Sequence, residues 1–258
     1  MFRLFLALAG ANLKLNLLIL ALLVFSSVAS SIPAIGGISG IISGYLLTYT
    51  MGALCRAVVE AGKPEAVKEL LSRCTVAEIL KKANAEATAG AYLGMLVNTT
   101  IITVSSVLFF ALLTVPVFTV AILNPHHLAQ RLSTGHAVLY LALALLITIY
   151  IALNFLFTAS VAMARGLLCD SFADALVEAL KGLTPRYFLL SLKPGLWRPS
   201  VAITLIALAA VAFSAAVAVI FRLAGIPLLL AFWAVFGVLL FHANVAYHYT
   251  CMKIMGLI

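Results

Sequence analysis

Five stretches of this chain carry no charged residue: 15–55, 87–130, 132–164, 199–221 and 223–252. Each contains at least the roughly 20 residues that an α-helix needs to cross a bilayer. Hydrophobic residues make up 65% of the chain and charged residues only 9%. A soluble domain of 258 residues could not bury this much apolar surface. The sequence therefore predicts an all-α, polytopic transmembrane helical bundle, placed in the cell membrane.

The first stretch is too long for one crossing, and Ser30, Pro33 and Gly36 indicate a turn inside it. The helix in the second stretch exceeds one span and contains Pro116, so we expect it to be kinked; two separate helices are the alternative. The prediction is three hairpins with helices at 15–32, 34–55, 92–122, 137–163, 200–221 and 225–250.

Basic residues fix the expected orientation. Fourteen of the 16 Lys and Arg residues fall on one side of these six helices, and only Arg131 and Arg222 fall on the other. The positive-inside rule assigns the crowded side, with both termini, to the cytoplasm. The net charge of +8 is then explained by contact with an anionic inner leaflet, so no direct nucleic-acid binding is inferred.

Two hairpins resemble each other where they leave the membrane. Aligning Arg56 with Arg165 also superposes Glu65 on Asp174 and Glu69 on Glu178. We expect a single membrane domain, 1–258, with candidate repeat units at 15–86 and 92–198 and a truncated unit at 200–258. Coincidence among common residues remains the alternative.

The two charged segments carry helix start signals. Thr75 with Glu78 forms a capping box, Ser171 with Asp174 resembles one, and Thr184 precedes a proline. These segments are expected to form short amphipathic cytoplasmic helices that lie on the inner leaflet or bind a cytosolic partner. The candidate docking residues are Arg56, Arg165, Glu65, Glu69, Asp174 and Glu178.

Small residues follow one face of the second predicted helix. Gly36, Gly40, Gly44 and Gly52 lie at spacings of four or eight. Such ridges let two helices approach closely in lipid, so we expect tight packing at this face. A bare face lining a pore or substrate route is the alternative.

Polar residues inside the predicted spans define a candidate pore or polar patch: Thr99, Thr103, Asn154, Thr158, His242, Asn244 and His248. No Asp or Glu lies in a predicted span, which disfavours coupling through a buried carboxylate. His126, His127 and His136 match no standard ligand spacing. No metal, cofactor or catalytic residue is therefore expected, and an intramembrane enzyme is disfavoured.

Two short motifs resemble known families. Gly37-Ile38-Ser39-Gly40 is similar to the serine motif of rhomboid proteases, but the predicted depths of Ser39 and His242 differ too much for a catalytic pair. Ala164-Arg165-Gly166 resembles a signature of energy-coupling-factor transporter T subunits, which contact ATPases. The counterpart reads Cys55-Arg56-Ala57, so the second signature is absent and no family is assigned.

These patterns favour a channel or permease subunit that works with a cytosolic ATPase, with other membrane subunits or as a homo-oligomer. A non-transporting scaffold or assembly component of a secretion or DNA translocation machine is the alternative.

Overall fold

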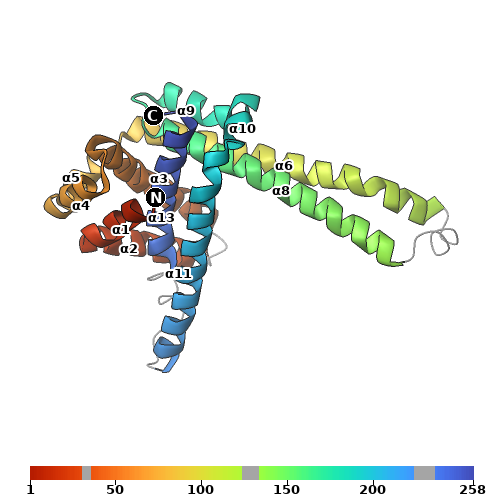
Figure 1. Cartoon of the computed structure of the whole chain (residues 1–258), viewed down its shortest axis with the longest axis horizontal. Helices are drawn as coiled ribbons and strands as arrows, with labels where there is room; N and C mark the ends of the chain where they lie inside the picture. The colour runs from red at the N-terminus through yellow and green to blue at the C-terminus, as the bar shows by residue number, and fades with distance from the viewer. Residues whose placement is uncertain (31–35, 124–133, 224–235) are drawn as a thin grey trace.

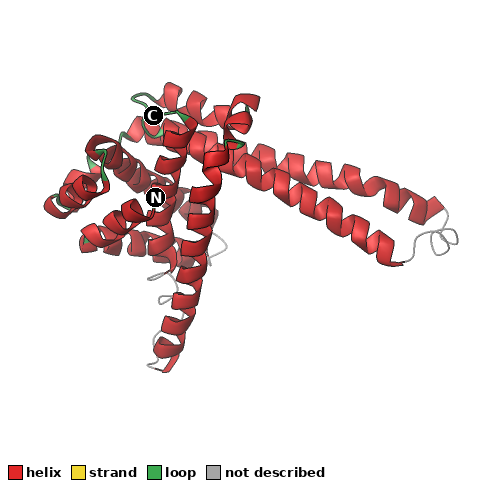
Figure 2. Ribbon diagram, viewed as in Figure 1, coloured by secondary structure: helices red, strands yellow, loops and turns green. Residues whose placement is uncertain are grey.

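The computed structural model describes residues 1–30, 36–123, 134–223 and 236–258, and these residues form helices without any strand (Figures 1 and 2). The predicted all-α class is confirmed. The α-helices are α1 (Phe2–Ala11), α2 (Leu13–Ser30), α3 (Gly36–Ala61), α4 (Pro64–Arg73), α5 (Val76–Leu80), α6 (Ala85–Leu123), α8 (Thr134–Gly166), α9 (Phe172–Leu180), α10 (Pro185–Ser191), α11 (Trp197–Leu223) and α13 (Val238–Met255). Two short 3-10 helices, η1 (Lys181–Leu183) and η2 (Pro194–Leu196), join them.

Four helical segments among the described residues are long and apolar enough to cross a membrane: Gly36–Ala61, Ala85–Val115, Val138–Gly166 and Pro194–Val217. The pair α1 and α2 meets the same criterion only when taken together, with a bend of 91° between them. These helices indicate a membrane protein. The predicted helix at 225–250 lies partly outside the described residues, so the count of six and the orientation of the termini stay predictions.

The helices extend beyond the predicted spans at their charged ends. α6 begins at Ala85 rather than at 92, because the Asn84 side chain accepts a hydrogen bond from the backbone N–H of Ala87 at 3.1 Å and so caps the helix. α3 likewise continues to Ala61, beyond the predicted end at 55. Residues 85–123 form one helix, as expected, with Pro116 inside it.

The N-terminal segment is a buried helix. Leu4, Phe5 and Leu8 of α1 are all at most 7% exposed, and α1 packs against α4 and α13. The bend into α2 is held by Asn12, whose Oδ1 accepts from the N–H of Leu15 while its Nδ2 donates to the carbonyl oxygen of Leu71.

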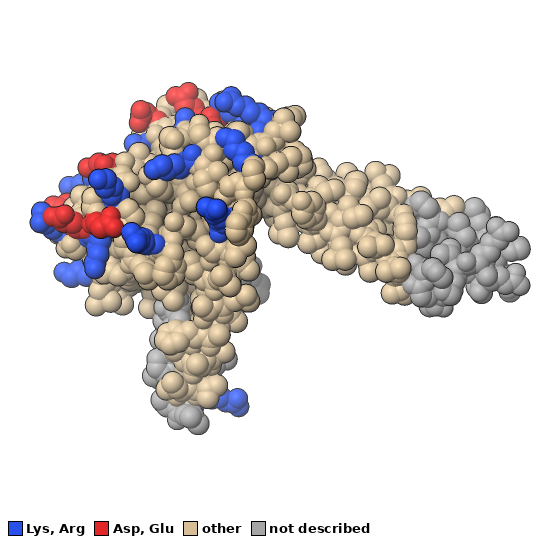
Figure 3. Space-filling view, viewed as in Figure 1, with Lys and Arg blue, Asp and Glu red and all other residues tan. Residues whose placement is uncertain are grey.

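The long helices diverge instead of running side by side along their whole length. The α6–α8 hairpin extends away from the rest of the chain, and α11 leaves the same region in a different direction (Figure 1). Charged side chains are spread over the end of the molecule from which these helices leave, α4 and α5 included (Figure 3), and α3, α6, α8 and α9 meet at one place within it. We call this place the hub and define it as the charged ends of α3, α6 and α8, the loop 167–170, and α9.

Candidate functional site

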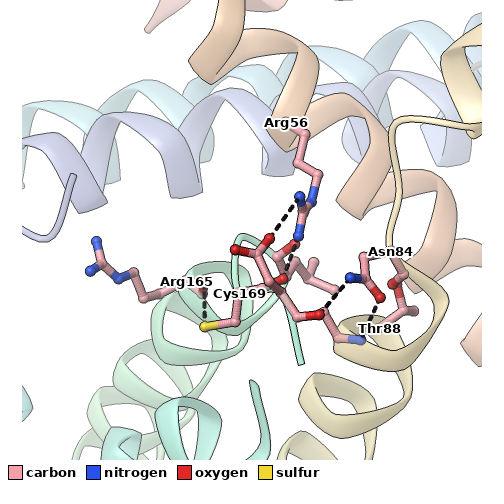
Figure 4. Close-up of polar contacts among 8 residues, drawn as sticks. Arg56, Asn84, Thr88, Arg165 and Cys169 are labelled. Atoms are coloured by element: carbon pink, nitrogen blue, oxygen red, sulfur yellow. Dashed lines mark hydrogen bonds and ion pairs between the residues drawn. The ribbon is translucent and has the colours of Figure 1, made fainter. Parts of the chain in front are cut away.

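The loop 167–170 is held by an arginine from another hairpin. Arg56, near the end of α3, donates from Nε to the carbonyl oxygen of Leu167 at 3.1 Å and from Nη2 to that of Cys169 (Figure 4). Its Nη1 lies 3.6 Å from the carboxylate of Asp170, whose side chain is 95% exposed. Hydrogen bonds from a charged donor are stronger than neutral ones. The main contribution of Arg56 is therefore to bind two backbone carbonyls and fix the path of this loop.

A second side chain binds the same loop from the start of α6. Asn84 donates from Nδ2 to the carbonyl oxygen of Asp170 at 2.7 Å, while its Oδ1 caps α6 through Ala87 (Figure 4). Asn84 thus links the start of α6 to the loop that follows α8, the other helix of this hairpin. With Arg56, it connects α3, α6 and α8 at a single point.

Helix α9 lies in a groove between α6 and α8 that is built from small residues. A Cβ atom at Gly90 would lie 2.2 Å from the carbonyl oxygen of Phe172, and one at Gly94 would lie 2.6 Å from the Cβ of Ala179. Asn98 donates from Nδ2 to the carbonyl oxygen of Ala179 at 2.8 Å, which satisfies an acceptor at the end of α9. Close approach of two backbones requires glycine at Gly90 and Gly94.

Glycines also form the close contacts on the α8 side of this groove. A Cβ atom at Gly166 would lie 2.8 Å from the carbonyl oxygen of Ala175. One at Gly182, just after α9, would lie 2.6 Å from the Cα of Ala159. One face of α9, with Ala175 and Ala179 buried, therefore packs tightly against both long helices, while Phe172, Asp174 and Val177 are exposed.

Glu178 of α9 forms the second polar centre of the hub. Tyr187 of α10 donates its hydroxyl to Glu178 Oε1 at 2.6 Å, and Lys181 donates to Oε2 at 2.7 Å. Burial acts to raise the pKa of Glu178, but the bonds from Lys181 and Tyr187 outweigh it and leave this pKa below its ordinary value. Burial and the bond to Glu178 raise the pKa of Tyr187.

The other candidate docking residues face outward. Glu65, Glu69 and Asp174 are exposed, and Glu69 pairs with Arg73 one turn along α4. Arg165 is partly exposed, and its guanidinium points away from the Arg56 contacts in Figure 4. The two arginines that align in sequence therefore differ in role, because only Arg56 binds the loop 167–170.

The glycines of α3 lie in two different settings. A Cβ atom at Gly44 would lie 2.5 Å from the Tyr92 hydroxyl, and one at Gly52 would lie 3.5 Å from Leu167 and 3.6 Å from Thr88. A Cβ atom at Gly40 would meet nothing within 4 Å. Gly36 begins the helix. Close contact is thus concentrated toward the hub end of the predicted ridge.

Four of the polar residues in the long hairpin bond to their own helices. Thr99 donates to Met95, Thr103 to Thr99, Asn154 to Tyr150 and Thr158 to Phe155, each through a backbone carbonyl oxygen. These bonds satisfy the side-chain donors without a partner across the hairpin. Thr158 is fully buried beside η1, whereas Thr103 is exposed on the surface of α6.

The polar residues of α13 are placed differently. His242 is fully buried, and its Nε2 lies 2.7 Å from Oδ1 of Asn16 in α2. Asn16 also donates from Nδ2 to the carbonyl oxygen of Ala9, so it links α1, α2 and α13. His248 is buried one and a half turns farther along the helix, and Asn244 is partly exposed between the two histidines.

Several of these residues could not be singled out from the pattern alone. Three asparagines, Asn12, Asn16 and Asn84, bond to residues that are distant in sequence. The sequence shows that they are polar residues beside apolar helices, but it does not predict their partners. Gly90, Gly94 and Asn98 do carry a signal, because small residues at spacings of four mark a close helix contact. No group of His, Cys, Asp and Glu in the described part of the chain is arranged to hold a metal ion; His126 and His127 lie outside it.

Comparison with known proteins identified no relative: no family model, no curated protein and no solved structure matches this chain.

Proposed function

We propose that the chain is a channel or permease subunit of a membrane complex, spanning the cell membrane with six helices and both termini in the cytoplasm. In this proposal a cytosolic partner, such as an ATPase, binds the hub. The observation that carries it is the convergence of Arg56 and Asn84 on the loop 167–170, which joins three long helices at one point.

The exposed acidic residues Glu65 and Asp174 lie on α4 and α9, on either side of this loop in sequence. A partner that contacts both would act on α9, and α9 is packed against α6 and α8 through glycine. Rigid elements in close contact transmit displacement because a packed interface resists compression. Binding or release of the partner would therefore shift the α6–α8 hairpin relative to α3.

A non-transporting scaffold is the second candidate. It is favoured by the self-contained hydrogen bonds of Thr99, Thr103, Asn154 and Thr158, which form no aligned polar route across the α6–α8 hairpin. Such a scaffold would use the same hub to assemble a secretion or DNA translocation machine, without itself conducting a substrate.

Purification from native membranes in mild detergent, followed by mass spectrometry of stoichiometric partners, tests the first part of the proposal. A co-purifying cytosolic ATPase is the expected result. Recovery of the chain alone or as a homo-oligomer would contradict the partner model.

Reconstitution separates the two candidates. The complex is placed in liposomes and the flux of ions and small solutes is measured with and without ATP. Flux above that of empty liposomes supports a channel or permease. A stable complex that shows no flux for any solute supports the scaffold.

A further inference from the structure

The charge of the chain is divided sharply at Glu178. All eight acidic residues lie between Glu60 and Glu178, whereas residues 179–258 contain six Lys and Arg and no Asp or Glu. Of those six, Arg186, Lys193, Arg198 and Lys253 form no ion pair with any described residue. The region around α10, η2 and the start of α11 is therefore basic, and Glu178, the carboxylate bonded to Tyr187 of α10, pairs with Lys181 rather than with these four cations.

A cleft that one of these cations, Lys193, helps to line opens between residues of α8 and α11. These two helices diverge from each other in Figure 1. The volume of the cleft is about 550 Å³. Tyr150, Leu153, Asn154 and Phe157 of α8 line one side, and Trp197 and Ser200 of α11 line the other. We call it the corner cleft. Ser191, Leu192, Lys193, Pro194 and Leu196 close the end nearest the hub, and Tyr247 of α13 completes the lining.

The end of the corner cleft that carries Lys193 is polar and held in place. Lys193 lines this end of the cleft, and its Nζ donates to the carbonyl oxygens of Ile254 and Met255, at 3.3 and 3.0 Å, and so caps α13. The guanidinium of Arg198 lies over the Trp197 ring at 5.7 Å. Arg198 lines a neighbouring pocket, and Trp197, which is 61% exposed, lines both that pocket and the corner cleft.

The α8 wall of the corner cleft carries apolar side chains beside Tyr150 and Asn154. Leu153 is 60% exposed there, and Phe157 packs against Tyr247 with ring centroids 5.9 Å apart. An exposed tryptophan that lies near cations and beside an apolar wall is typical of protein surfaces in the lipid headgroup layer of a membrane. A soluble polyanion would neutralise the cations but would gain nothing from the apolar wall.

We propose that the corner cleft binds an anionic phospholipid. Its phosphate lies at the rim of the cleft beside Trp197, toward Lys193 and Arg198, and an acyl chain runs along α8 over Leu153 and Phe157. The lipid fills the space between two hairpins that diverge from the hub, and its binding does not depend on whether the protein transports a substrate.

Native mass spectrometry of the delipidated full chain, titrated with phosphatidylglycerol or phosphatidylcholine, tests this proposal. Tighter binding of phosphatidylglycerol is expected. One cation near an anionic lipid surface contributes about 1 kcal/mol, so Lys193→Gln and Arg198→Gln should each weaken that binding about fivefold. Lys81→Gln is the matched control. It removes an exposed cation that does not line the cleft and is distant in sequence from the residues that do, so it should leave binding unchanged.

A variant that fills the cleft separates a seated lipid from general surface attraction. Leu153→Trp keeps every charge but occupies the apolar wall, and it should also weaken phosphatidylglycerol binding. Because Lys193 caps α13, Lys193→Arg is included to preserve both charge and fold, and it should bind like the wild type. Equal binding by Arg198→Gln, Leu153→Trp and Lys81→Gln would overturn the proposal, as would displacement of the lipid by soluble glycerol phosphate.

Discussion

The Nε of Arg56 lies 3.1 Å from the carbonyl oxygen of Leu167, although the two residues belong to different hairpins. Arg56 also binds the carbonyl oxygen of Cys169, so one side chain satisfies two acceptors of the loop after α8. Without it, these partly buried carbonyls would lose a charged donor.

Replacing Arg56 with Gln should lower the free energy of unfolding by about 1.5–3 kcal/mol, the usual contribution of hydrogen bonds to a charged group. Arg56→Lys should recover little, because an ammonium cannot reproduce two directed N–H groups of a guanidinium. Denaturation followed by circular dichroism in detergent measures both. Arg73→Gln is the control: it breaks an exposed pair with Glu69 and should cost no more than about 1 kcal/mol. Equal costs at Arg56 and Arg73 would contradict the role given to Arg56.

Gly90→Ala should destabilise the protein by about 1–3 kcal/mol, because the new methyl group would collide with the backbone of α9 at Phe172. Gly40→Ala places a methyl group in open space on α3, where replacing a helical glycine is neutral or stabilises by up to about 1 kcal/mol. Melting temperatures of the two variants in the same detergent compare these positions. A loss of stability for Gly40→Ala that equals or exceeds the loss for Gly90→Ala would contradict the close packing of α9 against α6 at Gly90.

The bond between Tyr187 and Glu178 predicts a pH dependence. Since the pKa of Glu178 is lower in the folded chain, its ionisation stabilises the fold above the ordinary glutamate pKa of about 4.3. This contribution is lost as the pH falls through the folded pKa. Tyr187→Phe should therefore cost most near neutral pH, and the difference from wild type should shrink on acidification.

Tyr45→Phe is the matched control for that experiment. Tyr45 donates to the carbonyl oxygen of Ala85, an acceptor that does not titrate. The loss of unfolding free energy caused by Tyr45→Phe should therefore stay constant with pH. If Tyr187→Phe showed the same flat profile, the hydrogen bond to ionised Glu178 would not contribute to folding.

Asn16→Ala should destabilise the contact between α2 and α13, because it leaves Nε2 of the buried His242 without its partner. An unsatisfied buried polar group costs about 1–3 kcal/mol. Asn154→Ala removes an asparagine whose amide bonds only to its own helix, at Tyr150, so its cost should be smaller. A double-mutant cycle with His242→Ala measures the coupling between Asn16 and His242 directly; a coupling energy near zero would contradict the pairing.

Local sequence signals predicted local structure well. Thr75 and Glu78 form the expected reciprocal capping box at α5, Ser171 accepts from the N–H of Asp174 at α9, and Pro185 begins α10. Each depends on residues within one helical turn, where backbone donors need a nearby acceptor. The all-α class and the membrane-length helices could be predicted from the composition and from the charge-free stretches, because both are properties of continuous segments of the chain.

Long-range packing was harder to infer. The glycines of α3 formed the most regular pattern, yet the closest approach to another backbone in the groove around α9 involves Gly90 of α6. A small-residue ridge shows where a close contact is allowed but not which helix supplies the other side. Arg56 was selected as a docking candidate, but its bonds to Leu167 and Cys169 depend on how two hairpins meet.

Site-specific photo-crosslinking in intact cells tests the central claim most directly. A crosslinker is placed at Glu65 on α4, at Asp174 on α9 and, as a control, at Val107 on the exposed apolar face of α6. The account predicts that one and the same cytosolic protein is captured from Glu65 and Asp174 and not from Val107. Capture of no cytosolic protein at Glu65 and Asp174, or equal capture at Val107, would contradict a partner that binds the hub and the adjacent helix α4.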